Sequence, residues 1–573
     1  MCGIFCTISR GQVVEPSQNA LDLLHRRGPD ILDSFSQIIP LPDSLNEPKT
    51  VCIHFTSSVL ALRGDGAAVQ PLKDTDSGSV LCWNGEAWKT DKGAVSGNDG
   101  MLVMDMLSKA SRQLDSQTSV LQVVEKIRGP FALVYFDGKR KLYYGRDCLG
   151  RRSLMKATLE DGSIVLSSVA DLTLNTKWAE VDADGLYVVD VLARDELSNT
   201  LTTTHIPGII SGANTTSSAS ASLTLPFTGM NRDVSSIPQY RINMQSSAVA
   251  EIEALLIQSL ELRTLNIHQR AEMTPNERKV NVAILFSGGL DCTLLARLTH
   301  HTLHPDQEID LLNVAFENPR IHKPGGDASL YETCPDRRTA RSSLIELQRT
   351  CPGRTFRLVC INVPFKLFQA HRQKVIDLIH PHNTEMDLSI TIALYFASRG
   401  VGIISESSTA DTATEIDYET PARVLLSGLG ADELFGGYRR HENAFTMHGL
   451  TSTGGLLDAL EEDISRIGKR NLGRDDRVLS HWGKEARYPF LDEDVVAWAL
   501  QAPVWKKVGF GFEPGDEADG GGLEPGKLVL RLLAKKLGMD CVAKEAKRAI
   551  QFGARTAKMG VGSGKTKGTQ QLS

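Results

Sequence analysis

Two patterns of hydrophobic positions follow one another along the chain. Up to about residue 175, short apolar or alternating runs are separated by glycine-rich turns, as over 51–62, 79–83, 131–137 and 141–146. Runs of this kind predict β-strands joined in antiparallel hairpins, and a helix is predicted over 101–110. We therefore expect an α+β domain in the first part of the chain.

From about residue 247 the pattern changes to apolar strands that alternate with helices. Strands are predicted over 281–286, 309–316, 356–363 and 424–427, and helices over 248–262, 293–299, 337–349 and 388–398. This alternation predicts βαβ units around a parallel sheet. We therefore expect an α/β domain in the second part.

The 573 residues exceed what one hydrophobic core holds, so two or more domains are expected. Residues 212–225, GANTTSSASASLTL, have no aromatic residue and no periodicity, which predicts an exposed linker or insertion. The polar end of the chain predicts disorder. The expected division is a first domain over 2–190, a linker or insertion over 200–246, a second domain over 247–560 and a disordered tail over 561–573.

Composition excludes several classes of protein. Hydrophobic residues make up 41% and charged residues 23%, as in ordinary soluble proteins. No apolar run is long enough to span a membrane, and a net charge of -6 gives no general signal for binding nucleic acid. The chain starts without a basic leader, and its ten cysteines form no CxxC pairs, so we expect a cytoplasmic protein with reduced thiols.

The segment 281–292, NVAILFSGGLDC, predicts a phosphate-binding turn between a buried strand and a helix. Gly288 and Gly289 let the backbone approach a phosphate closely, and the N–H groups at the start of the next helix favour anions. Asp291 can hold Mg²⁺ on a pyrophosphate. For these residues alone, a turn whose glycines serve packing is an equal alternative.

A second segment of the same kind, LLSGLGADELFGGY over 425–438, strengthens the nucleotide interpretation. Again a strand leads into a glycine-rich turn, here with the carboxylates Asp432 and Glu433. Ligands of open α/β sheets bind beyond the carboxyl ends of the strands. We therefore expect Asp291 and Asp432 to converge on one Mg²⁺–pyrophosphate.

These motifs resemble the ATP-pyrophosphatase (PP-loop) family, whose loop reads S-G-G-x-D-S. The resemblance implies cleavage of ATP between the α- and β-phosphates and adenylation of a substrate that a nitrogen nucleophile then attacks. It also implies a set of nucleotide, pyrophosphate and metal positions, with Asp291 and Asp432 as the metal ligands: Phe286, Ser287, Gly288, Gly289, Asp291, Cys292, Val314, Ser427, Gly428 and Asp432.

Cys2 is a candidate nucleophile. If Met1 is removed, Cys2 carries a free α-amine, whose ordinary pKa of about 7.7–8.0 suits it to act as a base for its own thiol. A cysteine at this position, taken singly, is more often a buried structural residue.

The surrounding motifs MCGIF, RRGPD, ALRG, NGE and GNDG occur in an order that resembles the class II glutamine amidotransferase domain of asparagine synthetases. The resemblance implies an Ntn-type glutaminase fold, with antiparallel sheets between helices. It assigns the oxyanion hole to Asn84 and Gly85, which act with Cys2. It assigns the binding of free glutamine to Arg63, Glu86 and Asp99, because an amino-acid zwitterion needs both a cation and an anion.

The later segments 471–492 and 546–559 look closest to a divergent branch of the asparagine synthetase family, so the resemblance covers nearly the whole chain. Three positions depart from the family pattern. Leu429 stands where the family has a carboxylate, Ala549 where it has a lysine, and Cys292 where it has a serine. Lys547 and Arg548 are near enough to Ala549 to substitute for that lysine.

The resemblance implies a glutamine-hydrolysing asparagine synthase-like enzyme with glutamine, ATP and aspartate as substrates and Mg²⁺ as cofactor. Ammonia would pass from the glutaminase to an acyl-adenylate, and a homodimer stays open. Because of Leu429 and Ala549, two alternatives also stay open: a regulatory homologue that binds nucleotide or glutamine without making asparagine, and an amidotransferase with another acyl acceptor. His300 and His304 are not expected to form a zinc site. The residues His380, His382, Glu385 and Asp387 are weak candidates for an active site.

Overall fold

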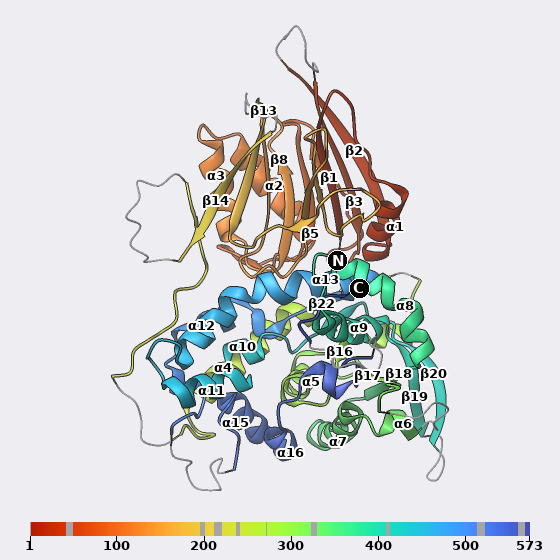
Figure 1. Ribbon diagram of the computed structural model, residues 1–573, viewed down its shortest axis with the longest axis vertical. Helices are drawn as coiled ribbons and strands as arrows, with labels where there is room; N and C mark the ends of the chain where they lie inside the picture. The colour runs from red at the N-terminus through yellow and green to blue at the C-terminus, as the bar shows by residue number, and fades with distance from the viewer. Residues whose placement is uncertain are drawn as a thin grey trace. The chain divides into compact units, whose positions relative to one another are not determined.

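The computed structural model describes residues 2–41, 50–194, 201–210, 221–235, 241–270, 272–321, 329–407, 413–512, 522–559 and 568–572. The chain forms two compact units (Figure 1). Unit 1 consists of Met1–Pro226, Asp377–His382 and Ile467–Lys484. Unit 2 consists of Phe227–Ile376, Asn383–Arg466 and Glu485–Ser573. Each unit therefore draws on segments that are far apart in the sequence.

Unit 1 contains two β-sheets. The first, in the order β12-β10-β11-β1-β3-β2, is antiparallel and comprises Ala179–Glu180, Met155–Thr158, Ile164–Ser167, Gly3–Arg10, Thr50–Val59 and Ile31–Pro40. The second has the order β15-β14-β13-β9-β8-β5-β4 and comprises Leu223–Thr224, Leu201–Ile209, Gly185–Arg194, Lys141–Arg146, Phe131–Phe136, Ser79–Gly85 and Leu72–Asp74. Only β15 pairs in parallel in this sheet, within the described residues.

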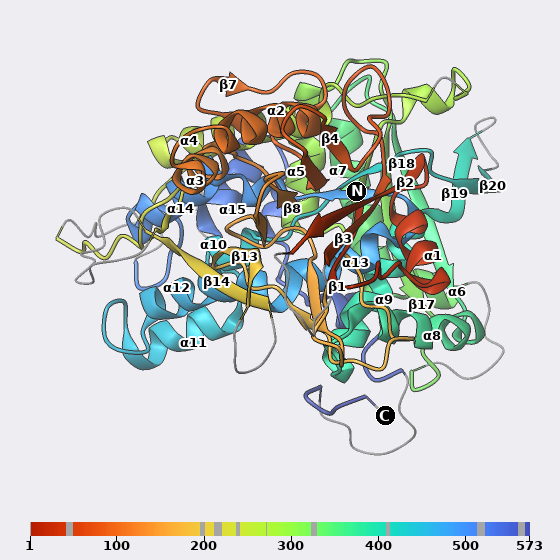
Figure 2. The same ribbon diagram turned by 90° about the horizontal axis from the view of Figure 1, so that it is seen from above.

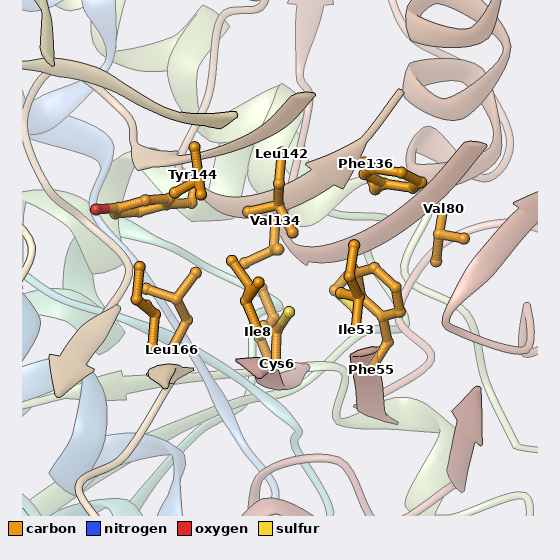
Figure 3. Close-up of a cluster of buried hydrophobic side chains, with 14 of the residues drawn as sticks. Cys6, Ile8, Ile53, Phe55, Val80, Val134, Phe136, Leu142, Tyr144 and Leu166 are labelled. Carbon is orange, nitrogen blue, oxygen red and sulfur yellow. The ribbon is translucent and has the colours of Figure 1, made fainter. Parts of the chain in front are cut away.

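The main core of unit 1 lies between the two sheets. Figure 3 shows inward-facing side chains of β1 and β3 against those of β5, β8 and β9. Outside this core, α1 (Gln18–Arg27) packs on the first sheet, while α2 (Asp99–Ser111) and α3 (Ser116–Lys126) pack on the second (Figure 2). Unit 1 also holds the hairpin β6 (Lys89–Thr90) and β7 (Gly93–Ala94), the π-helix Gly468–Leu472, α13 (Gly473–Leu479) and the 3-10 turn Ser480–Trp482. The expected α+β fold with antiparallel sheets between helices is confirmed at this level.

The predicted linker needs a correction. Strand β14 starts at Leu201 and pairs with β13, so residues 201–209 belong to the second sheet of unit 1. The cause is the burial of Leu201 and Ile206, which are the strand's apolar anchors among threonines. Residues 211–220 and 236–240 of the predicted linker lie outside the described residues.

Unit 2 is built on a seven-stranded sheet in the order β20-β19-β18-β17-β16-β21-β22. The strands are Ala413–Glu419, Val401–Ser407, Phe356–Val363, Ile309–Phe316, Val282–Leu285, Val424–Leu426 and Glu485–Arg487. The five strands from β18 to β22 in this order are parallel, whereas β19 and β20 join antiparallel at one edge. The expected α/β fold with a parallel sheet is confirmed, and the predicted strands 309–316 and 356–363 coincide with β17 and β18.

Helices surround this sheet in the ribbon (Figure 1). They are α4 (Ser247–Thr264), α5 (Leu290–Thr302), α6 (Ser329–Glu332), α7 (Pro335–Thr350), α8 (Phe365–Ile379), α9 (Glu385–Arg399), α10 (Ala431–Leu434), α11 (Arg439–His448), α12 (Leu456–Ile467), α14 (Glu493–Gln501), α15 (Leu528–Lys536), α16 (Asp540–Lys544) and α17 (Ile550–Gly553). Short 3-10 turns span Glu277–Lys279, Pro489–Leu491 and Val504–Lys506. In the described part of the chain, we find no helix with the length and apolar character needed to cross a bilayer.

The strand order of unit 2 reverses beside β16. From β16 the chain continues to β17 and β18 on one side, and it returns to β21 and β22 on the other. In open α/β sheets, such a reversal leaves a crevice at the carboxyl ends of the two strands, where ligands bind. The turns after β16 and β21 are therefore the place to look for a site.

The predicted tail also differs from the structure in part. Residues 568–572 are hydrogen-bonded to the backbone around the start of α9, through Met386 to Gly568, Glu385 to Gln570 and Leu572 to Asn383. Backbone pairing of this kind places the segment, contrary to the expected disorder. Residues 561–567 and 573 lie outside the described residues.

Candidate functional site

Cys2 lies at the start of β1 and is buried. The side chain of Gln70 links it to strand β5: Gln70 Nε2 donates to Cys2 Sγ at 3.8 Å, and Gln70 Oε1 accepts from the N–H of Trp83 at 2.8 Å. On its other side, Arg27 Nε donates to the Cys2 carbonyl at 3.3 Å. The thiol is thus connected to the residue that precedes Asn84.

Asn84 is fully buried near the end of β5, and neither polar atom of its side chain has a hydrogen-bond partner among the described residues. A buried amide left unpaired costs about 1–3 kcal/mol, so its presence needs an explanation. Gly85 follows at a point of close approach, where a Cβ would lie 2.6 Å from the carbonyl oxygen of Pro130. An unpaired amide donor beside a glycine backbone is what an oxyanion hole requires.

The two charged residues Arg63 and Asp99 bind opposite ends of Ala87. Arg63 Nη1 donates to the Ala87 carbonyl at 2.9 Å, and Asp99 Oδ2 accepts from the Ala87 N–H at 2.9 Å. Arg63 Nη1 also lies 3.5 Å from Glu86 Oε2, and Asp99 Oδ2 accepts from Trp83 Nε1 at 2.9 Å. The structure therefore brings together the cation and the two carboxylates that the sequence predicted to bind an amino acid.

Burial raises the pKa of Asp99, while the nearby Arg63 guanidinium works in the opposite direction. A further cation nearby, such as an α-ammonium group, would stabilise the ionised form of this buried carboxyl group. The guanidinium group of Arg63 has five N–H donors. Two of its nitrogens donate to the carbonyls of Ala87 and Val95. Donors remain for an α-carboxylate.

In unit 2, the turn after β16 has a shape that only glycine allows. Gly288 has a φ of +80°, and a Cβ there would lie 2.4 Å from the backbone nitrogen of Ala340 in α7. Ser343 Oγ donates to the Gly288 carbonyl at 2.6 Å and fixes the turn. Helix α5 starts after Gly289 without a side-chain cap, so its first N–H groups are suited to an anion.

The side chains of Ser287 and Cys292 make contacts inside this turn. Ser287 Oγ accepts from the N–H of Gly289 at 3.3 Å and lies 3.6 Å from Cys292 Sγ, and Cys292 Sγ donates to the Gly289 carbonyl at 3.3 Å. Cys292 therefore makes local contacts within the turn. Phe286 is buried before the turn, and Val314 is buried in β17 two residues before that strand ends.

The turns after β16 and β21 touch each other. A Cβ on Gly428 would lie 2.9 Å from Asp291 Cβ, so the second turn approaches the first at this glycine. Ser427 is held by its N–H bond to the Arg487 carbonyl at 3.0 Å, and its Oγ accepts from the N–H of Leu429 at 3.3 Å. All nucleotide positions implied by the resemblance except Val314 therefore lie in or beside these two turns and the helices that follow them.

Asp291 and Asp432 meet at the ammonium group of Lys527. Nζ lies 2.6 Å from Asp291 Oδ2 and 2.7 Å from Asp432 Oδ1, and Lys547 contacts Asp432 Oδ2. Burial pushes the pKa of Asp432 upward, but the two lysines outweigh it and hold that pKa well below its usual range. Asp432 is thus ionised, and Asp291 lies beside it on the same ammonium group.

The donor set fits Mg²⁺. Asp291 Oδ1 is buried and has no hydrogen-bond partner among the described residues. Mg²⁺ in nucleotide sites takes one or two carboxylates together with phosphate oxygens. Nowhere in the described ranges do three or more His, Cys, Asp or Glu side chains gather in a way that would hold a metal without such help.

The weak histidine candidates have local roles. Asp387 and Thr384 form a capping box at the start of α9, and Glu385 lies 4.0 Å from Arg372. His382 lies 3.7 Å from Glu180 in unit 1, and His380 precedes a cis proline. His300 accepts from Arg354 Nε at 3.4 Å, and burial together with nearby cations lowers its pKa to about 4. None of these contacts involves the two turns.

The sequence did not indicate Gln70 or Lys527. Gln70 has an uncharged side chain outside the motifs, and Lys527 lies 236 residues after Asp291. Lys547, one of the two basic residues near Ala549, contacts Asp432, and its role in place of a lysine at Ala549 stays a prediction.

Comparison with known proteins gives one family match. The asparagine synthase family model matches residues 386–461 and 450–560. The chain is 32% identical to asparagine synthetase domain-containing protein 1 of Bos taurus, over 98% of this chain and 96% of that protein. It is also 32% identical to an asparagine synthetase domain-containing protein of Saccharomyces cerevisiae, over 92% and 89%. A protein of Acanthamoeba polyphaga mimivirus named "Probable asparagine synthetase (glutamine-hydrolyzing)" is 25% identical, over 87% and 78%.

Proposed function

The chain belongs to the family of asparagine synthetase domain-containing protein 1, and from that premise we propose that it is an ATP-dependent, glutamine-hydrolysing amidotransferase of the asparagine synthase kind. Unit 1 is the glutaminase and has the Ntn-type fold. Unit 2 is the PP-loop ATP-pyrophosphatase. Aspartate is the proposed acyl acceptor.

One observation carries the proposal: Asp291 and Asp432 meet at a single ammonium group beside the point where the strand order reverses. The two residues are 141 positions apart, from 432 minus 291, and come from different strand-end turns. A pair of adjacent carboxylates beside an uncapped helix start is suited to a metal-bound polyphosphate.

In unit 1 the proposed reaction starts with Cys2. Its thiolate attacks the side-chain amide carbon of glutamine, after the α-amine of Cys2 has taken the thiol proton. Asn84 Nδ2 and the Gly85 N–H hold the oxygen that becomes negative. The intermediate collapses to a thioester as the amide nitrogen takes a proton and leaves as ammonia. Water then attacks the thioester and releases glutamate and the thiol.

In unit 2 a carboxylate oxygen of the acceptor attacks the α-phosphorus of ATP, and pyrophosphate leaves. Ammonia then attacks the acyl carbon and AMP leaves, so that an amide forms. Gly288, Gly289 and the start of α5 bind and orient the phosphates, and Asp291 and Asp432 would hold Mg²⁺. When bound, Mg²⁺ neutralises charge on the phosphates.

Leu429 favours a second candidate function. This side chain follows Gly428 in the second turn and supplies no carboxylate where the family has one. Losing a charged contact made only in the transition state costs a large factor in rate. The alternatives are therefore a regulatory homologue that binds glutamine or nucleotide without making asparagine, and an amidotransferase with a different acceptor.

A single assay separates these functions. Pyrophosphate release from ATP is measured with the purified full chain, with and without aspartate, and with glutamine or ammonia as the nitrogen source. The proposed function predicts release that depends on aspartate and on either nitrogen source. Cys2→Ala should abolish glutamine-dependent release and keep ammonia-dependent release.

The matched control is Cys541→Ala, because Cys541 is an exposed thiol outside both sites. It should behave as the unchanged protein. Glutamate release by Cys2→Ala would refute the glutaminase assignment. Pyrophosphate release with another carboxylate but not with aspartate would show a different acceptor, and nucleotide binding without any release would favour the regulatory alternative.

A further inference from the structure

The ammonium group shared by the two turns of unit 2 belongs to a cluster of opposite charges. Lys527 Nζ lies 2.6 Å from Asp291 Oδ2 and 2.7 Å from Asp432 Oδ1, while Lys547 contacts the other oxygen of Asp432. Two carboxylates therefore face two ammonium groups. Arg531, which also lies in the field of both carboxylates, is paired with Glu524. Glu433, next to Asp432, adds a further carboxyl, which accepts from Tyr438 Oη at 2.6 Å. The ammonium groups beside Asp291 and Asp432 nevertheless oppose the approach of a free divalent cation.

The backbone conformation of Lys527 holds its side chain in this position. Its φ is 55°, in the left-handed region that residues other than glycine seldom adopt. Its N–H donates to the Phe435 carbonyl at 2.9 Å, and its side chain is 5% exposed. A lysine held in an uncommon conformation by a buried contact is a positioned group rather than a mobile surface cation.

Gly437 provides the space for the pair. A Cβ at this position would lie 2.1 Å from Asp432 Oδ1 and 2.2 Å from Lys527 Cε. The chain around Asp432 is thus shaped to admit the lysine side chain against the carboxylate.

We propose that Lys527 keeps divalent cations out of this site unless they arrive with a polyphosphate, so that the metal enters only as part of the metal–nucleotide complex. The inference rests on the proposed function, which assigns the site to ATP. Asp291 Oδ1 is buried and unpaired, so a ligand atom is present. What opposes a lone metal ion is the ammonium group beside it.

A bound polyphosphate would remove the electrostatic repulsion between the ammonium groups and a metal ion. Its oxygens offer Lys527 and Lys547 new charge-assisted partners, and the carboxylate oxygens that the lysines leave become ligands for the metal. The two lysines thus act as positioning residues that exchange partners when the nucleotide binds.

The test uses Mn²⁺ as the probe, with bound and free Mn²⁺ distinguished by electron paramagnetic resonance in the absence of nucleotide. The full chain is compared with Lys527→Met, which keeps much of the side-chain length and removes the charge. We expect little Mn²⁺ binding by the unchanged protein and at least about tenfold tighter binding by Lys527→Met, because one cation beside two carboxylates is gone. Adding Asp291→Asn to Lys527→Met should remove the gain.

Two further variants isolate the charge at this position. Lys536→Met is the matched control, since Lys536 is the last residue of α15, the helix that Lys527 precedes, and pairs with Glu253 at 2.7 Å at a partly exposed site. It should leave Mn²⁺ binding unchanged. Lys527→Arg keeps the positive charge and should bind Mn²⁺ as weakly as the unchanged protein.

Each outcome has a defined meaning. If Lys527→Met does not fold, Lys547→Met replaces it, with a smaller gain expected because Lys527 stays in place. If the unchanged protein binds Mn²⁺ alone as tightly as the variant does, yet also binds Mn²⁺ with ATP, the lysine proposal is overturned and the proposed function stands. If the unchanged protein does not bind ATP with Mn²⁺, the proposed function fails and this inference fails with it.

Discussion

At the scale of single residues, both sites hold a buried polar atom with no hydrogen-bond partner among the described residues, but the groups around that atom differ. Asp291 and Asp432 are paired with lysines, whereas the amide of Asn84 is buried with no partner among the described residues. A protein that keeps such an unpaired group loses stability by it. The arrangement is understandable if the missing partner is an oxygen that becomes negative during a reaction.

Asn84→Ala tests this interpretation. Loss of one oxyanion donor should lower kcat for glutamine hydrolysis by about 10²–10³-fold, while KM for glutamine changes little because Arg63 and Asp99 are intact. The melting temperature should stay the same or rise, since an unpaired buried amide is removed. Steady-state glutaminase kinetics and thermal unfolding measure the two effects.

The control for Asn84→Ala is Asn19→Ala, which removes a part-buried amide bonded to Asp171 at 2.8 Å elsewhere in unit 1. Its turnover should be unchanged. An Asn84→Ala protein with normal kcat would show that this amide does not hold the oxyanion.

At the scale of elements, the turn between β16 and α5 depends on one glycine. Gly288 combines a φ of +80° with a backbone contact that leaves no room for a Cβ. The contact is with α7, so the turn, the helix that follows it and a third element are fixed together. A change here should disturb the proposed phosphate site more than a change at an open glycine of the same unit.

Gly288→Ala should lower the free energy of unfolding by more than about 2 kcal/mol, from left-handed strain together with the steric clash, and should abolish ATP binding. Gly229→Ala is the matched control, because nothing lies within 4 Å of its added Cβ. It should change stability by less than about 0.5 kcal/mol. Urea unfolding and calorimetric ATP titration measure both, and equal effects of the two substitutions would contradict this account.

The sequence predicts those elements and residues that a short stretch of hydrophobic pattern or motif identifies. Strands β17 and β18 are mostly apolar, as is usual where helices cover a parallel sheet on both faces, and Asp291 follows a recognisable turn. Strand β14 was missed because threonines surround its apolar anchors Leu201 and Ile206. Lys527 could not be found, because its role depends on a contact across 236 residues that no local pattern records.

At the scale of the whole molecule, stability should depend on pH through a buried acid in unit 2. Asp336 lies in the first turn of α7, where burial raises its pKa from 3.8 to about 7 against the opposing charge of Arg548. In the unfolded chain the group ionises near its ordinary pKa. Between pH 4 and pH 7, roughly, the folded protein therefore holds a proton that the unfolded chain has lost, so stability falls as pH rises.

This contribution should lower the free energy of unfolding by at most about 4 kcal/mol across that window. Asp336→Asn should remove it, so that the variant gains stability relative to the unchanged protein at pH 8 but not at pH 4. Denaturant unfolding at both pH values measures the difference. Asp306→Asn, at an exposed acid beside His304, is the control and should show no such gain. Parallel pH profiles for Asp336→Asn and the unchanged protein would refute the prediction.

Unit 1 is completed by residues that the chain supplies late. Arg27, fully buried, bonds Asp476 at 2.8 Å, 449 positions further on, and Arg477 bonds Glu180 at 2.8 Å. During synthesis on the ribosome, the first 226 residues emerge while this arginine still has no carboxylate to neutralise it. The nascent unit 1 stays incomplete until residue 484 has left the exit tunnel. A chain that ends before that point therefore contains neither compact unit in complete form.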